Sequence, residues 1–257
     1  MNNKVQEFRN LHQKGNPVII ANVWDVISTK AAEKAGYKVI GASSHPIADT
    51  LGYKDGQNMS FEEAFFITNR IAKSTELYVS LDMESGYTED LEKLNQYVEK
   101  LVDAGVIAIN LEDGLTNGED RKLGSIEILA NKIKSIKEYL NSKNKDIFIN
   151  ARIDTYTTKH SNAFDETLNR AQEYKAAGAD GIFVPLITDK HEIKTLLETV
   201  EIPLNIFLTP DFNDYDTIKE LGIQRISSGN KAQAVIVKEI ENVFHELNEN
   251  KNFKILF

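Results

Sequence analysis

The sequence predicts an α/β protein, a single-domain (β/α)8 (TIM) barrel that takes in residues 1–257. Short apolar runs rich in Val and Ile alternate with longer amphipathic segments, at about one run every 30 residues, which is typical of this barrel. The alternative is an open, doubly wound sheet. Its usual Gly-x-Gly-x-x-Gly signature does not follow the first apolar run, so the barrel is favoured.

Eight apolar runs are expected to form the barrel strands. Continuous apolar runs of this length indicate strands that are buried on both faces, as in a parallel sheet. In chain order the predicted strands are 17–23, 38–42, 77–82, 106–112, 146–152, 181–185, 203–207 and 224–228.

The segments between these runs have the spacing of helices. In 91–104 and 126–140, apolar residues recur every three or four positions. Several predicted helices end in an Ala-Gly pair just before a strand, where glycine suits the left-handed end of a helix. These pairs are Ala35-Gly36, Ala104-Gly105 and Ala177-Gly178. The tail, 232–247, is expected to be the eighth helix.

Composition and charge exclude several kinds of function. The net charge of −9 makes nucleic acid and anionic membranes unlikely to be attracted, so neither is an expected partner. The chain has no cysteine, which excludes disulfides, thiolate metal sites and a Cys nucleophile. Residues 1–16 lack the apolar core of a signal peptide, and no apolar run approaches the roughly 18 residues of a membrane span. We therefore expect a cytoplasmic protein.

Charged residues gather at the ends of the third, fourth and fifth predicted strands, the edge that carries the chemistry in such barrels. They are Asp82, Glu84, Glu112, Asp113, Arg152 and Asp154. Five carboxylates at one rim would repel one another, and a single arginine cannot neutralise them. A further cation could, and Mg²⁺ prefers carboxylate oxygens. The charge balance predicts a Mg²⁺ site, which Mn²⁺ could also occupy. Alternatively, Asp113 and Asp154 cap the helices that follow them.

Arg152 is expected to bind a carboxylate of the substrate, because its planar guanidinium matches that group. The alternative is an ion pair with Glu112 or Asp82. The pair Ser43-Ser44 offers hydroxyl and backbone N–H groups to an anion.

The histidines divide into two groups. His45 follows the serine pair directly and is either functional or solvated. The others are expected to lie in solvent on helices or loops: His12, His160, His191 and His245.

Seven stretches, in order along nearly the whole chain, resemble the isocitrate lyase/phosphoenolpyruvate mutase superfamily. They are Asn22–Asp25, Gly41–Ser44, Leu51–Asp55, Asp82–Tyr87, Asn110–Asp113, Ala151–Asp154 and Ala177–Gly181. The resemblance implies a (β/α)8 barrel that forms or breaks a C–C or P–C bond beside a pyruvate enolate.

The resemblance also implies roles for individual residues. Asp82 would bind the metal, and Glu84 and Glu112 would hold its waters. The residues expected to contact the substrate are Ser43, Ser44, His45, Arg152 and Asp82. The residues expected to act in catalysis are Asp55, on the loop after the second strand, Arg152 and His45.

Departures from the family pattern narrow the reaction. Isocitrate and methylisocitrate lyases carry a Lys-Cys-Gly loop after the fourth strand, whereas 114–124 has no Cys, so the acid that protonates the departing enolate is absent. The P–C bond enzymes carry Glu-Asp-Lys where this chain has Glu112-Asp113-Gly114. They also carry His at the end of the sixth strand, where this chain has Val184-Pro185.

The sequence therefore predicts a Mg²⁺-dependent lyase or decarboxylase that cleaves a C–C bond of a small 2-oxo or 2-hydroxy dicarboxylate. One alternative is a phosphonopyruvate hydrolase or phosphoenolpyruvate mutase, and another is a non-catalytic barrel that binds an oxo acid. The resemblance implies a homodimer or homotetramer that exchanges the last helix, about 231–247. It also places the charged run Glu119–Lys122 where the family has a mobile gating loop.

Overall fold

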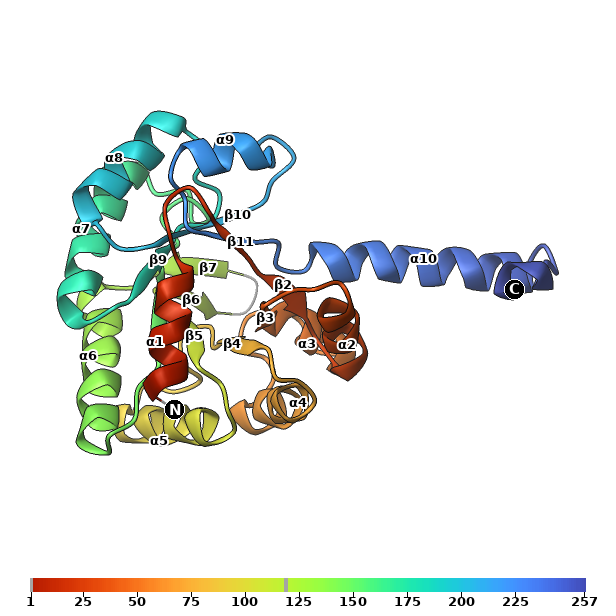
Figure 1. The fold of residues 1–257 in the computed structure, drawn as a ribbon, viewed down its shortest axis with the longest axis horizontal. Helices are drawn as coiled ribbons and strands as arrows, with labels where there is room; N and C mark the ends of the chain where they lie inside the picture. Colours follow the sequence, from red (N-terminus) through yellow and green to blue (C-terminus); the bar gives the residue numbers. More distant parts are fainter. Residues whose placement is uncertain (1, 118–119) are drawn as a thin grey trace.

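A closed ring of parallel strands forms the centre of this computed structural model, which describes residues 2–117 and 120–257 (Figure 1). The first strand has two parts, β1 (Val18–Ile19) and β2 (Ala21–Val23). Because β1 pairs with the last strand, β11 (Arg225–Ser227), and β2 pairs with β3 (Val39–Ala42), the first strand closes the ring. The predicted (β/α)8 barrel is confirmed.

The remaining barrel strands lie within the predicted runs. They are β4 (Tyr78–Asp82), β5 (Ala108–Glu112), β8 (Phe148–Arg152), β9 (Gly181–Phe183) and β10 (Leu204–Phe207). The sheet order, β1-β11-β10-β9-β8-β5-β4-β3-β2, follows the chain around the ring. Barrel strands that are consecutive in the sequence are therefore neighbours in the sheet, and so are their ends.

Helices cover the outside of the ring (Figure 1). They are α2 (Val26–Lys34), α4 (Phe61–Lys73), α5 (Leu91–Asp103), α6 (Ile126–Ser142), α7 (Ala163–Ala177), α8 (Lys190–Val200) and α9 (Tyr215–Glu220). In α5 the predicted apolar stripe faces the strands, with Leu94, Val98 and Leu101 fully buried. Burial of each such leucine contributes roughly 1.5–3 kcal/mol to folding. The predicted glycine ending is also observed, since Gly178 caps α7 with a φ of 108°.

The first helix, α1 (Asn2–Leu11), closes the end of the ring at which the strands begin. Its Val5 and Phe8 are fully buried against residues such as Val39 and Phe148, at the starts of their strands. The expectation that His12 lies in solvent is wrong. Only 8% of His12 is exposed, and its ring stacks on Phe148 with a centroid distance of 4.8 Å. The other three histidines expected in solvent are exposed.

Two insertions stand at the opposite end of the ring, where the strands finish. The short helix α3 (Ser44–Leu51) follows β3. An antiparallel hairpin of β6 (Gly114–Asn117) and β7 (Asp120–Leu123) follows β5, in place of the loop expected over 114–124. Glu119, part of the predicted gating run, lies outside the described residues.

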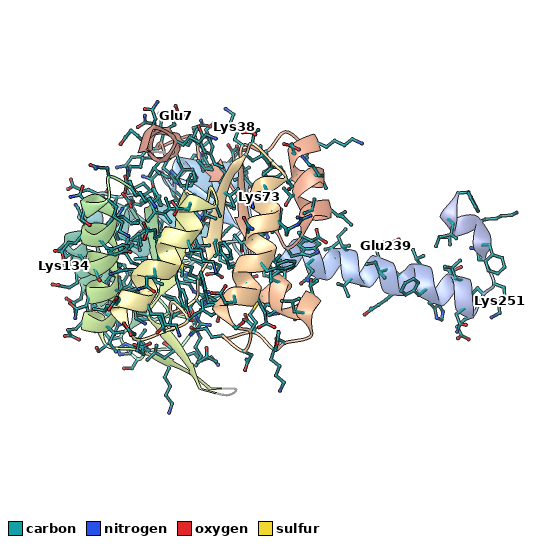
Figure 2. All side chains as sticks on the ribbon, turned by 90° about the horizontal axis from the view of Figure 1, so that it is seen from below. Glu7, Lys38, Lys73, Lys134, Glu239 and Lys251 are labelled. Atoms are coloured by element: carbon teal, nitrogen blue, oxygen red, sulfur yellow. The ribbon has the colours of Figure 1, made fainter. Side chains whose placement is uncertain are left out.

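The last helix, α10 (Lys231–Asn248), points away from its own barrel and ends in a short 3-10 turn, η1 (Phe253–Leu256) (Figures 1 and 2). The predicted helix over 232–247 is therefore present. Figure 2 shows Glu239 on this helix and Lys251 beyond it, both well clear of the barrel. Among the described helices, none is both long and apolar enough to cross a membrane.

Candidate active site

The predicted charged residues meet at the rim where the strands end. Asp82 ends β4, Glu112 ends β5 and Arg152 ends β8. Glu112 and Arg152 are register partners on neighbouring strands, so the sheet itself sets them side by side. One pocket at this rim is lined by Asp82, Glu112 and Arg152 together with the predicted Glu84 and Asp55.

Two acids and two arginines form a closed square of ion pairs in this pocket. Arg152 contacts Glu112 Oε2 through Nη1 at 3.0 Å, and Asp154 Oδ1 through Nη2 at 2.9 Å. Across the square, Nη2 of Arg121 lies 2.5 Å from Glu112 Oε1 and 2.7 Å from Asp154 Oδ2. Both acidic side chains are almost completely buried, so their charges need these partners. The ion pair of Arg152 with Glu112, the alternative to a role in substrate binding, is therefore present.

The expectation of a single arginine facing five carboxylates is wrong for two reasons. Arg121, on β7, brings a second cation into the pocket. Asp113 turns away from the pocket, because its carboxylate accepts hydrogen bonds from Arg170 (2.9 Å) and the Tyr174 hydroxyl (2.8 Å) of α7. Contacts between distant parts of the chain decide both outcomes. The local signal for Arg121 was its place in the charged run Glu119–Lys122, and Asp113 had none. The acids of this pocket that lie outside the square are Asp82, Glu84 and Asp55.

Asp82 is the last residue of β4, and Glu84 lies on the loop that follows it. Oδ2 of Asp82 accepts a hydrogen bond of 2.8 Å from the Ser44 hydroxyl, whereas Oδ1 is buried and has no partner among the described residues. Glu84 is only 4% exposed. Burial, followed by the neighbouring charges of Glu112, Asp82 and Asp55, raises the pKa of Glu84 to about 9.

These two carboxylates fit a hard divalent cation. A buried carboxylate oxygen without a donor is costly, and a cation would satisfy it and reduce the repulsion between the acids. In the described part of the chain, no three Asp, Glu, His or Cys side chains converge closely enough to hold an ion directly. That arrangement suits Mg²⁺, which is usually bound through one or two carboxylates and keeps several waters.

The start of α3 forms one wall of the pocket. Ser43 is the N-cap residue, and its hydroxyl makes no capping hydrogen bond, although the residue is only 5% exposed. The N–H groups of Ser44 and His45 belong to the first turn of the helix, where backbone donors lack partners within the helix. The Ser44 hydroxyl, in contrast, is bound to Asp82.

His45 and Asp55 form an ion pair at the mouth of the pocket. His45 Nδ1 lies 3.2 Å from Asp55 Oδ2, and its Nε2 lies 3.5 Å from Asp49. The hydrogen bond to Asp55 raises the pKa of His45, although burial opposes it. Burial alone would raise the pKa of Asp55, but the bond from His45 and the nearby Arg121 and Arg152 lower it.

Gly114 has a steric reason to be glycine. A Cβ at this position would collide with the Asp154 carboxylate and lie 2.6 Å from Arg121 Nε. The guanidinium of Arg121 thus crosses directly over the backbone where the P–C bond enzymes carry lysine. No side chain fits there in this arrangement of the hairpin.

A third arginine, Arg225 of β11, lies beneath the pocket inside the ring and was not predicted as a site residue. It is 2% exposed, and its Nη2 lies 3.2 Å from Ser80 Oγ and 3.4 Å from Asn110 Oδ1. Burial lowers the pKa of Arg225 to about 10, while the charge of Asp82 opposes that shift. A charged residue inside the apolar run 224–228 was the signal that could have revealed it.

Fold and pocket together define a (β/α)8 barrel enzyme whose site combines anion-binding arginines with a pair of carboxylates suited to a cation. The chain belongs to the phosphoenolpyruvate phosphomutase family, whose model matches residues 8–248. The predicted membership of the isocitrate lyase/phosphoenolpyruvate mutase superfamily is thereby confirmed.

Known proteins similar to this chain include enzymes of several activities. An uncharacterized protein of Mycobacterium tuberculosis is 34% identical over 86% of this chain and 81% of its own length. Oxaloacetate decarboxylase 1 of Pseudomonas fluorescens is 27% identical over 91% of this chain and 81% of its own length. The crystal structure of 2,3-dimethylmalate lyase superposes with a TM-score of 0.86 at 20% identity, over 97% of this chain and 87% of that one, which supports the fold.

Proposed function

We propose that the protein is a divalent-metal-dependent lyase that decarboxylates a small 2-oxo dicarboxylate of the oxaloacetate type. The observation that carries the proposal is the orphaned oxygen of Asp82, which lies in the same pocket as the guanidinium of Arg152. A cation held by Asp82 would contact the oxo group of a 2-oxo acid, and Arg152 would bind the carboxylate of the same acid. The decarboxylase activity named for the Pseudomonas relatives supports the same substrate class.

Asp82 would hold Mg²⁺ or Mn²⁺ directly, and Glu84 and Glu112 would hold its waters. When bound, the cation supplies electrostatic stabilisation of the negative charge that develops on the substrate. Arg152 binds the carboxylate next to the oxo group. Ser43 would support that carboxylate with its hydroxyl, and the unpaired backbone N–H groups at the start of α3 would add further donors.

The His45–Asp55 pair has the position to return a proton. Loss of CO2 leaves an electron pair on the adjacent carbon, and one proton from the enzyme or from water must replace the departed group. Asp55 orients the imidazole through Nδ1 and favours its protonated form. We propose that His45 delivers this proton from the pocket mouth, where its side chain is 39% exposed to water.

Decarboxylation fits this chain better than aldol-type cleavage. A leaving enolate needs an acid, and the Cys-bearing loop that supplies one in the lyases has no counterpart in the sequence 114–124. In decarboxylation no proton has to be taken from the substrate as carbon dioxide leaves, and the enolate that remains gains its proton afterwards, from His45 or from water. P–C bond chemistry is less suited, because the Lys of Glu-Asp-Lys is replaced by Gly114, over which Arg121 crosses.

The test is pyruvate formation from oxaloacetate with Mg²⁺, measured above the background of the metal ion alone. We expect turnover by the natural protein and its loss in Asp82→Ala and Arg152→Ala. Lys134→Ala, on the exposed face of α6, is the control and should retain full activity. Turnover that persists in Asp82→Ala would contradict the proposed site. Binding of oxalate without turnover of oxaloacetate would instead favour a non-catalytic oxo-acid-binding barrel.

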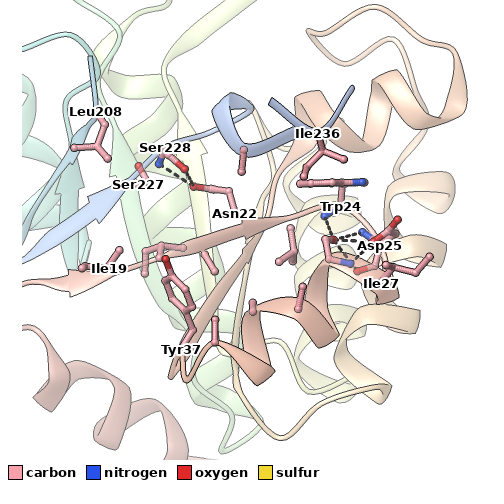
Figure 3. A pocket seen from close by; sticks show the side chains of 18 of the residues that line it. Ile19, Asn22, Trp24, Asp25, Ile27, Tyr37, Leu208, Ser227, Ser228 and Ile236 are labelled. Atoms are coloured by element: carbon pink, nitrogen blue, oxygen red, sulfur yellow. Dashed lines mark hydrogen bonds between the residues drawn. The ribbon is translucent and has the colours of Figure 1, made fainter. Parts of the chain in front are cut away.

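We also propose that the protein is a homodimer or homotetramer that exchanges α10 between subunits. An apolar groove runs along the barrel beside α2, at the place where an eighth helix would pack (Figure 3). Its walls include Ile19, Trp24, Ile27 and Leu208, and Ile236 of α10 borders it. Ile27 is 81% exposed.

The protruding helix is the complement of this groove. It exposes apolar side chains along its length, among them Val235, Ile236, Ile240 and Phe244. Exposed apolar surface of this extent is uncommon on a monomer and marks an interaction surface. The α10 helix of a second copy has an apolar face that complements this apolar groove, and a reciprocal exchange would bury both.

A further inference from the structure

Of the arginines that the structure describes in and beneath this pocket, one is not carried by a barrel strand. Arg152 projects from β8 and Arg225 from β11, whereas Arg121 projects from β7 of the hairpin above the rim. We propose that Arg121 binds the distal carboxylate of the substrate and so selects dicarboxylates over monocarboxylates. The inference rests on the proposed function, and it assigns to the hairpin the recognition of the second acidic group.

Arg121 has donors to spare for such a group. A guanidinium offers five N–H donors, and Arg121 meets both Glu112 and Asp154 through Nη2. Its Nε is buried and has no acceptor among the residues that the structure describes. A quarter of the side chain is still exposed to the pocket and its mouth. An incoming carboxylate would bind through guanidinium donors other than Nη2, because Nη2 is the nitrogen that makes both ion pairs of the square.

The two arginines stand at different depths, which matches the two ends of a short dicarboxylate. Arg152 lines both the outer pocket and the inner cavity of the ring, where Ser43 and Asp82 also lie. Arg121 lines only the outer pocket, together with His45 and Asp55. A substrate whose oxo-acid end lies beside Asp82 would therefore direct its far end toward Arg121.

The hairpin is built to hold Arg121 in this place. The absence of a side chain at Gly114 leaves room for the guanidinium, since a Cβ there would lie 2.8 Å from Arg121 Nη2. Thr116, the register partner of Arg121, packs on Gly56 of the loop that carries Asp55. The side chain that recognises the far carboxylate is thus fixed relative to the proposed proton donor.

A kinetic signature follows from the chemistry of the departing group. The distal carboxylate is charged in the bound substrate, but it loses its charge as it becomes CO2. Its attraction to Arg121 therefore stabilises the bound substrate more than the transition state. Removal of Arg121 should raise KM for oxaloacetate and leave kcat unchanged or increased.

The experiment compares the binding of two ligands by calorimetric titration in the presence of Mg²⁺. Oxalate is only as long as the oxo-acid end of the substrate, so it has no carboxylate in the distal position. 3,3-Difluorooxaloacetate has one. We expect Arg121→Gln to weaken difluorooxaloacetate binding by about 10- to 100-fold, as for loss of a charged hydrogen-bonded pair, and oxalate binding by less than threefold. Arg152→Gln should weaken both ligands.

Lys122→Gln is the matched control, because this exposed neighbour on the same strand loses the same charge. It should change neither affinity, and Arg121→Lys should recover part of the lost affinity. Equal weakening of both ligands in Arg121→Gln would overturn the inference, since Arg121 would then only hold Glu112 and Asp154. No weakening of either ligand would overturn it as well. A natural protein that binds neither ligand would refute the proposed function together with this inference.

Discussion

Arg170 and Asp113 form a buried ion pair of 2.9 Å between α7 and the end of β5, directly beside the pocket but facing away from it. Because of this pair, two acids that are adjacent in the sequence have different roles. Glu112 faces the pocket, whereas Asp113 fastens a helix to the barrel. Variants of these adjacent residues should therefore have different consequences.

Substitution of Asp113 should affect stability and spare ligand binding. Asp113→Ala leaves the Arg170 guanidinium, of which only 6% of the side chain is exposed, with Glu166 as its remaining acidic partner. Breaking a buried pair from one side costs about 3–5 kcal/mol, so the free energy of unfolding measured in urea should fall by about that amount. The oxalate affinity of the folded protein should be unchanged. A large loss of affinity at full stability would mean that Asp113 belongs to the site.

Substitution of Asp82 should have the opposite profile. Its Oδ1 lacks a donor. Asp82→Asn removes repulsion from Glu84 and Glu112. It also removes attraction to Arg152 and Arg225. Because these effects oppose each other, we expect the free energy of unfolding without metal to change little, while stabilisation by added Mg²⁺ disappears. Thermal unfolding with and without Mg²⁺ measures both effects. Undiminished stabilisation by Mg²⁺ in this variant would place the cation elsewhere.

His12 should make stability depend on pH. Burial, together with the charge of Arg225, lowers its pKa to about 3. The unfolded chain therefore takes up a proton near pH 6.5, whereas the folded chain does not until about pH 3. The free energy of unfolding should fall as pH falls through this window, by up to about 1.4 kcal/mol per pH unit from this group.

Replacing the histidine isolates this contribution. Denaturant unfolding of His12→Gln between pH 7 and 4 should show a shallower loss of stability than the natural protein. His160→Gln removes an exposed histidine and should leave the pH dependence unchanged. The same slope in all three proteins would refute the assignment to His12.

Gly56 should couple the Asp55 loop to the hairpin. Its φ is 95°, and an added Cβ would lie 2.7 Å from Thr116 Cγ2. Gly56→Ala should therefore cost about 1 kcal/mol or more in stability and displace the hairpin. Gly52→Ala has a similar positive φ of 80° but open space around the Cβ, so it is the control for backbone strain alone. If contact with Thr116 matters, Thr116→Ala should partly restore Gly56→Ala, and equal stability losses in both glycine variants would argue against coupling.

The exposed face of α10 should control assembly. Ile240→Asp places a charge in the middle of its apolar stripe, where 46% of Ile240 is exposed in the single chain. We expect light scattering after size exclusion to show a dimer or tetramer for the natural protein and a monomer for this variant. Glu239→Gln on the same turn is the control and should assemble normally. A natural protein that is monomeric at micromolar concentration would refute the exchange of α10.

The sequence by itself determined the barrel and the rim on which the site lies. Strand order follows chain order in this fold, so local apolar runs were enough to place Asp82, Glu112 and Arg152 on neighbouring strand ends. Periodicity and glycine endings are likewise local properties, and they predicted the helices correctly. The predicted family was confirmed as well, because the motifs that carry the resemblance are local stretches of sequence at these strand ends.

Only the tertiary structure decided how the charges are paired and which surfaces remain uncovered. Arg121 meets Asp154 across 33 positions of sequence, and Arg225 reaches Ser80 across 145. His12 is buried because α1 closes the ring, and α10 is a regular helix whose direction its own periodicity does not specify. Pairing and direction depend on contacts between distant segments, and local patterns carry no information about those contacts.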